Sequence, residues 1–125
     1  MKILISGTRE GVDLIIIKTM INHVIDIYPN ESFILLHGNA NGVDKQTNNY
    51  VKTLGWQSQS YPPDWTLGKK AGVLRNQDMV DQQPDVGIFI PGPNSIGTYD
   101  CLERFKLLNK PYLLYNFNTR SYTIN

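Results

Sequence analysis

Short apolar runs alternate along the chain with longer segments in which apolar residues recur at helical spacing. The first run, KILIS at residues 2–6, is rich in β-branched residues and is followed by glycine. This is typical of a buried parallel strand. Residues 12–28 come next, with apolar side chains on one helical stripe and Pro29 directly after them. The chain is therefore predicted to open with a strand and then a helix.

The same alternation continues almost to the end of the chain. The expected strands are residues 2–6, 32–37, 56–62, 85–91 and 111–117, and the expected helices are residues 12–28, 43–55, 69–83 and 97–110. Strands that alternate with crossover helices predict a parallel sheet with helices on both faces. We therefore expect a three-layer, Rossmann-like α/β domain with a five-stranded, mostly parallel sheet. Residues 1–117 should form this single domain, and residues 118–125 a C-terminal tail that is either an edge strand or a frayed end.

Composition and charge exclude several classes of protein. The 125 residues include 41% hydrophobic and 18% charged residues, as in ordinary globular proteins. Twelve basic residues against eleven acidic ones give a net charge of +1, which argues against stable binding to duplex nucleic acid. Small anions stay possible, because they need only a local positive site.

The single cysteine, Cys101, has no partner for an intramolecular disulfide, so a reducing, cytoplasmic compartment is the expected location. No stretch approaches the length of apolar residues that a membrane span needs. The apolar run near the N-terminus is too short for a signal peptide. We therefore expect neither association with a membrane nor secretion.

Four segments rich in glycine, hydroxyl, amide or charged side chains follow the first four strands. They are SGTRE (6–10), HGNANGVD (37–44), YPPDWTLGKKAG (61–72) and PGPNSIGTYD (91–100). The carboxyl ends of parallel strands share one edge of a sheet, where ligands bind and helix N-termini offer free amides. The glycines and Asp44 of the first two segments are each explained by plain turns, whereas PGPNSIGT is longer than a plain turn needs and its amides and hydroxyls suit phosphate oxygens. Together the four segments predict a site for an anionic small molecule.

Individual side chains in these segments have a structural and a functional interpretation. Arg9 and Arg75 offer planar donors that match phosphate oxygens, although surface arginines are usually only solvated. Trp65 is either a core anchor or a surface for stacking a base, and Asp64 bonds either ribose or its own loop backbone. His37 ends a strand, where a structural role is commoner than acid–base chemistry. No cluster with metal-ligand spacing is present, so neither a metal nor a cofactor is expected.

The four segments resemble, in the same order, those of the SLOG superfamily, and most closely its YpsA-related branch. DW at 64–65 with AG-x-x-RN-x-x-MV at 71–80 is the most specific part, and the resemblance extends from Ile3 to about Tyr115. It implies a nucleotide or nucleotide-derived ligand held between the first, second and fourth loops.

The same superfamily contains LOG-type phosphoribohydrolases, which cleave the base from a nucleoside monophosphate. Arg75 and Met79 match part of their signature, with Asn76 in place of a lysine, and Gly97 and Thr98 match a later part. The position of the catalytic glutamate falls on Cys101, with Asp100 directly before it. A thiol lacks the negative charge that this carboxylate supplies.

This departure favours a non-catalytic binder that senses or sequesters a nucleotide. The alternative is a LOG-like nucleoside monophosphate phosphoribohydrolase, an N-glycosidic hydrolase that would use Asp100 and Arg75 as catalytic residues. Ribose would meet Asp44, Asp64 or Asn76, and the base would meet Trp65 or Tyr61. A homodimer or higher oligomer through the apolar segment 12–28 is left open, because burial in the core explains the same pattern. The expected ligand-binding residues are Gly7, Thr8, Arg9, Gly38, Asn39, Gly42, Asp44, Asp64, Trp65, Arg75, Asn76, Gly92, Asn94, Ser95, Gly97 and Thr98.

Overall fold

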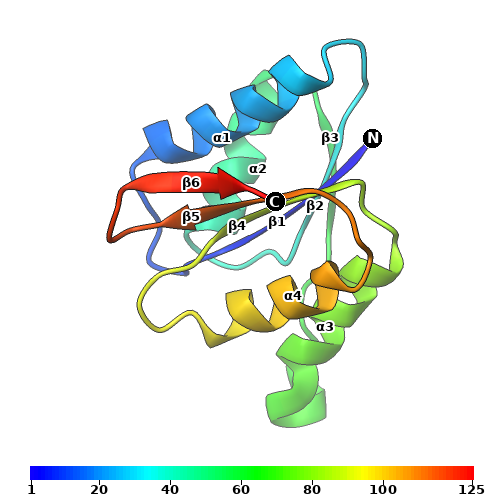
Figure 1. Ribbon diagram of the computed structural model, residues 1–125. Coiled ribbons are helices and arrows are strands. Elements are labelled where there is room, and N and C mark those ends of the chain that lie inside the picture. Colours follow the sequence, from blue (N-terminus) through cyan, green and yellow to red (C-terminus); the bar gives the residue numbers. More distant parts are fainter.

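A computed structural model describes residues 1–125 and shows one mixed sheet between two layers of helices (Figure 1). The elements are β1 (Lys2–Gly7), α1 (Leu14–Ile27), β2 (Ile34–His37), α2 (Val43–Thr53), β3 (Gln57–Ser60), the 3-10 helix η1 (Trp65–Lys70), α3 (Ala71–Asp81), β4 (Val86–Ile90), α4 (Ile96–Lys106), β5 (Tyr112–Asn116) and β6 (Ser121–Ile124). The strand order is β3-β2-β1-β4-β5-β6, and only β6 runs antiparallel to its neighbour. The predicted three-layer, Rossmann-like α/β fold is confirmed.

The two faces of the sheet bury two separate hydrophobic cores. Helices α1 and α2 cover one face, and α3 and α4 cover the other (Figure 1). Successive side chains of a strand point to opposite faces. Ile3 and Ile5 of β1 accordingly pack against α1, whereas Leu4 packs with Phe89 and Phe105 on the α4 side. A helix on each face explains why the central strands β1 and β4 are apolar at nearly every position.

The connections reverse direction beside β1. From β1 the chain passes through α1 to β2 on one side, and from β3 it passes through α3 to β4 on the other side. Gly7 at the end of β1 is paired with Ile90 at the end of β4. The loops that leave these two strands therefore diverge and open a crevice at the switch point, where α/β sheets of this kind bind ligands.

The C-terminal residues form a sixth strand, so the tail is an edge strand and not a frayed end. Tyr112 and Asn125 exchange two backbone hydrogen bonds of 3.1 and 2.9 Å, and the hydroxyl of Tyr122 is hydrogen-bonded to His23 of α1. The sheet thus has six strands where five were expected. The segment predicted as one helix over 69–83 is preceded by η1, which begins within the long third loop.

The longest helix, α1, has 14 residues. None of the helices combines the length and the apolar character that crossing a bilayer requires.

Candidate functional site

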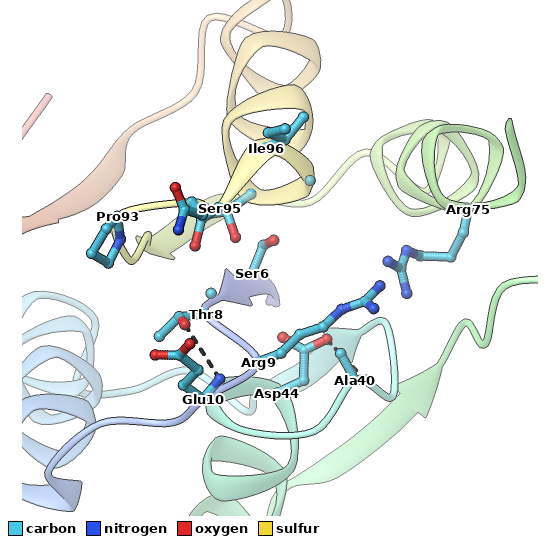
Figure 2. A pocket seen from close by; sticks show the side chains of 14 residues that line it. Ser6, Thr8, Arg9, Glu10, Ala40, Asp44, Arg75, Pro93, Ser95 and Ile96 are labelled. Atoms are coloured by element: carbon cyan, nitrogen blue, oxygen red, sulfur yellow. Dashed lines mark hydrogen bonds between the residues drawn. The ribbon is translucent and has the colours of Figure 1, made fainter. Parts of the chain in front are cut away.

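A cavity of about 350 Å³ lies at the switch point, between the residues that follow β1 and those that follow β4 (Figure 2). It is lined by residues 6–10, by Ala40 and Asp44, by Arg75 of α3 and by residues 93–98. The expected ligand-binding residues in this lining are Gly7, Thr8, Arg9, Asp44, Arg75, Asn94, Ser95, Gly97 and Thr98. Segments that are far apart in sequence therefore meet at one edge of the sheet.

The turn after β1 is locked to the start of α2. The carbonyl oxygen of Thr8 accepts hydrogen bonds from the amides of Gly11 and Val43, at 3.3 and 3.1 Å. Gly42 caps α2 with φ of 79°, and a Cβ there would come within 2.6 Å of the Arg9 backbone. Only glycine tolerates both the positive φ and this contact. The fit holds Arg9 and Asp44 at the same side of the cavity.

Asp44 is a buried carboxylate with one satisfied and one unsatisfied oxygen. Oδ2 accepts hydrogen bonds from the amides of Gly38 and Ala40, at 3.0 and 3.4 Å, whereas Oδ1 is buried without a partner. The residue is only 5% exposed. Burial raises the pKa of the Asp44 carboxyl to about 6, against the opposing effect of the two amides and of the Arg75 and Arg9 charges. An unpaired buried acceptor is costly, so Oδ1 suits a hydrogen-bond donor from a ligand.

The N-terminus of α4 offers free backbone donors to the cavity. Ser95 precedes the helix, but its hydroxyl accepts from the amide of Gly92 at 2.7 Å and makes no capping bond to α4. The amides of Gly97 and Thr98 have no hydrogen-bond partner within the protein, and both residues line the cavity. Amides at a helix start carry partial positive charge, so this end of α4 is suited to an anion.

Arg75 enters the cavity from α3, and Figure 2 shows its guanidinium pointing towards Arg9 and Asp44. Nη1 donates to the carbonyl oxygen of Gly38 at 2.7 Å, and Nε donates to Asn76 Oδ1 at 2.9 Å. Burial lowers the pKa of the Arg75 guanidinium, and the nearby Asp44 charge opposes that shift. The guanidinium is thus held in place by two bonds and keeps its remaining N–H groups for a ligand.

Asn76 lies behind Arg75 and not in the lining. The residue is only 2% exposed, and its Nδ2 donates to the Gly97 carbonyl at 3.1 Å and to Asp100 Oδ2 at 3.0 Å. The amide group therefore joins α3 to the first turn of α4 and orients Arg75 through Oδ1. In this structure Asn76 positions other groups, and its direct contact with a ligand stays a prediction.

Of the two residues that the hydrolase alternative would use, Arg75 lines the cavity and Asp100 does not; Cys101, at the position of the catalytic glutamate, also lies outside the lining. Asp100 Oδ2 accepts from Arg104 Nε at 2.9 Å as well as from Asn76, which occupies that carboxylate oxygen. Cys101 is fully buried in the core between the sheet and α4. Burial raises the pKa of its thiol to about 12, so the side chain is an unreactive thiol at neutral pH.

The third loop contacts the cavity through the packing of its Trp65 ring against Arg9, which lines the cavity. The Arg9 guanidinium carbon lies 5.9 Å from the centre of the Trp65 ring, which is 58% exposed. Asp64 accepts from the amide of Thr66 at 3.1 Å and caps η1. Trp65 is therefore an exposed aromatic surface beside the site, and Asp64 makes the loop bond that was one of its two interpretations.

The remaining predicted residues support the walls. Gly38, Asn39 and Gly42 form the turn before α2, and the backbone amide of Asn39 donates to His37 Nδ1 at 3.1 Å. Burial lowers the pKa of His37, so its imidazole is a neutral structural group at neutral pH. Gly92 makes the bond to Ser95 and lies beside Thr8.

Sequence reasoning did not single out Ser6, Glu10, Ala40, Pro93 and Ile96, which also line the cavity. Each is next to a predicted site residue or within one of the four loops, and that adjacency was the available signal. No three His, Cys, Asp or Glu side chains are close enough together to hold a metal ion.

The fold and the cavity define a Rossmann-like α/β domain with a polar, partly cationic site at its switch point. The chain belongs to the YspA, cpYpsA-related SLOG family (YAcAr), whose family model matches residues 1–68. This confirms the resemblance to the YpsA-related branch of SLOG proteins. The matched part holds the first two loops of the site, together with Asp64 and Trp65.

The chain is also similar to the Gene 61 protein of Mycobacterium phage D29. The two are 28% identical over 118 residues, which cover 90% of this chain and 94% of the phage protein. No solved structure matches the chain.

Proposed function

We propose that this protein binds a nucleotide or a nucleotide-derived small molecule in the switch-point cavity, as a sensor or a sequestering protein. The observation that carries the proposal is the pair of free amides at Gly97 and Thr98 in one cavity with Arg75 and Arg9. Membership of the SLOG family is consistent with a ligand of this kind.

The anionic end of the ligand is assigned to α4 and the arginines. Phosphate oxygens accept hydrogen bonds from helix N-terminal amides, and a guanidinium adds planar, charge-assisted donors. Arg75 is already oriented by Gly38 and Asn76, so little side-chain freedom is lost when a ligand binds. The volume of about 350 Å³ lies within the range of small-molecule sites.

The uncharged part of the ligand is assigned to Asp44 and Trp65. A ribose hydroxyl donating to Asp44 Oδ1 would supply the partner that this oxygen lacks. The Trp65 ring, beside Arg9, offers a face on which a base can stack. A ligand with both an anionic group and a hydroxyl-bearing sugar matches this arrangement better than inorganic phosphate does.

Binding without turnover is preferred to glycosidic hydrolysis. Asp100, the candidate carboxylate for a LOG-like reaction, is bonded to Asn76 and Arg104 and does not line the cavity. The hydrolase alternative requires this carboxylate to reach the sugar, which would first break both bonds.

Native mass spectrometry of the protein purified from cells tests the proposal, followed by calorimetric titration of the compound that is identified. The expected result is an added mass that matches a nucleotide-derived molecule. The same compound, when it is added to the protein, should displace the co-purified molecule. Absence of binding across a panel of nucleoside phosphates would overturn the proposal. Release of free base from a nucleoside monophosphate, abolished by Asp100→Asn, would replace it with the hydrolase.

A further inference from the structure

A second cavity lies on the other side of the loop that leads into α4. Its volume is about 670 Å³, and it is bounded by Pro91, Gly92 and Pro93, by Tyr99 of α4 and by the turn that joins β5 to β6. In Figure 1 this turn and the loop after β4 lie at the same end of the sheet. Pro93 also lines the first cavity, so this loop is a wall that the two cavities share.

The second cavity differs from the first in its chemistry. No acidic, basic or histidine side chain lines it, whereas two arginines and two carboxylates line the first cavity. Besides the tyrosines Tyr99 and Tyr115, its polar side chains are the amides and hydroxyls of Asn116, Asn118, Thr119, Ser121 and Thr123. A cavity of this composition suits a neutral group that carries its own donors and acceptors.

Two exposed aromatic rings line this cavity from different elements. Tyr99 on α4 is 49% exposed, and Phe117 after β5 is 38% exposed. Phe117 is held by an edge-on contact with Tyr115, at 4.7 Å between ring centres. An oriented and exposed ring is a stacking surface for a planar group, and hydrogen-bonding side chains nearby can read the edge of that group. A nucleobase is a group that is planar, neutral and polar at its edge.

The positions of the cavities relative to the sheet suggest how one ligand would use both. The first cavity lies between the ends of β1 and β4 and extends to Asp44 after β2, with Trp65 beside it, and the second lies over the ends of β4 and β5. A two-based ligand that crosses a switch point places one half on each side of it, with its phosphates at a helix N-terminus between them. Here that helix is α4, whose first turn follows the shared wall directly.

We infer that the second cavity binds the second base of a dinucleotide-type ligand, in which two nucleoside units are joined through phosphates. The phosphates lie at Gly97 and Thr98, one nucleoside lies beside Asp44 and Trp65, and the other lies across Pro93 between Tyr99 and Phe117. This inference rests on the proposed function and names the class of molecule that the same site would take.

Matched pairs of ligands test the inference by titration calorimetry. The pairs are ADP with diadenosine diphosphate and GDP with diguanosine diphosphate, each pair differing by one added nucleoside. The expected result is that the two-based member of at least one pair binds about tenfold more tightly, as stacking of one additional base provides. Tyr99→Ala and Phe117→Ala should each abolish this preference, so that the two members of a pair bind with about equal affinity. Both variants should change the affinity for the one-based member by less than about twofold.

Two control variants separate stacking from general damage. Tyr99→Phe keeps the ring and should keep the preference, whereas Trp65→Ala should weaken both members of a pair by a similar factor. The inference is overturned if no two-based ligand is preferred, or if the preference survives in both alanine variants. If no nucleotide binds, or if Arg75→Ala leaves every affinity unchanged, the proposed function itself fails and the inference falls with it.

Discussion

Arg75 Nη1 donates to the carbonyl oxygen of Gly38 at 2.7 Å and so ties α3 to the turn that follows β2. The two residues fit closely, because a Cβ added at Gly38 would lie 2.7 Å from Arg75 Cζ. The guanidinium can therefore take its observed position in the cavity only because residue 38 is a glycine.

We predict that Gly38→Ala displaces the Arg75 guanidinium and weakens ligand binding by about 1.5–3 kcal/mol, the range of a charge-assisted hydrogen bond. The methyl group would occupy the space that the guanidinium now fills, so the side chain must move. Titration calorimetry with the ligand identified for the wild-type protein measures the effect.

Gly72→Ala is the matched control for that substitution. A Cβ at Gly72, within α3, would meet no atom within 4 Å. Alanine is favoured over glycine inside a helix by about 0.5–1 kcal/mol. This variant should bind as the wild type does and be slightly more stable. Equal affinities of the two glycine variants would contradict the predicted clash.

Arg75→Ala should weaken binding of the anionic ligand by about 1.5–3 kcal/mol, because it removes a charged donor from a partly buried site. Lys106→Ala is a suitable control, since it removes a positive charge from an exposed position of α4 whose only ion pair is with Glu103. Calorimetry should show normal affinity for that control. An unchanged dissociation constant for Arg75→Ala would remove Arg75 from the site.

Asp44 links the site to stability through its buried charge. Its pKa is raised from 3.8 to about 6, so the folded protein binds this proton more tightly than the unfolded chain does. The free energy of unfolding therefore falls as the pH rises from about 4 to about 6, and the penalty is complete above that range. Two pKa units correspond to about 3 kcal/mol.

We predict that Asp44→Asn increases the free energy of unfolding by about 1–3 kcal/mol at pH 7.5 and has little effect near pH 4. The asparagine oxygen can still accept from the amides of Gly38 and Ala40, while the charge is lost. Urea denaturation of both proteins at the two pH values measures the difference. A pH-independent difference, or destabilisation at pH 7.5, would refute the assigned burial penalty. The same variant should bind the ligand more weakly.

Cys101 should react with a thiol reagent only when the protein unfolds. The side chain is fully buried, and burial raises its pKa to about 12, so the reactive thiolate is scarce at pH 8. We expect labelling in native buffer to be at least about a hundredfold slower than in denaturant. Prompt labelling of the native protein, followed by absorbance, would show that this part of α4 opens readily.

The strand β6 should contribute measurably to stability. Tyr122 packs against the larger core, and its hydroxyl is hydrogen-bonded to His23. Tyr122→Ala should lower the free energy of unfolding by about 2–3 kcal/mol, and Tyr122→Phe by about 1 kcal/mol. The exposed Thr123→Ala should change it by less than about 0.5 kcal/mol. Urea titration compares the three, and equal stabilities would indicate that this strand adds nothing to the folded state.

The sequence predicted the fold well where the pattern is local. The runs that became β1 and β4 are apolar at nearly every position, because each is buried on both faces. The helical stripe in residues 12–28 likewise predicted one buried face, which Ile17, Ile21 and Val24 of α1 form in the structure. The strand β6 was harder to recognise, since it is short and its pairing with β5 is specified across the sheet and not within its own residues.

The candidate site was predictable as a set of loops and less so as a set of contacts. The cavity gathers nine of the expected residues because parallel strands end at one edge of the sheet. The direction of Asn76 and Asp100 depends instead on how α3 packs against α4, which periodicity does not encode. Arg75, the residue before Asn76, points to the cavity, whereas Cys101, the residue after Asp100, points to the core.

The edge strands of the sheet affect the tendency of the folded protein to aggregate. The outermost strands, β3 and β6, are four residues each, and β3 consists of glutamine and serine alone. A short edge strand gives an approaching polypeptide few backbone groups to pair with, and β3 adds no apolar side chain to such a contact. Growth of fibrous assemblies by pairing of one sheet with the next is consequently disfavoured at the β3 edge.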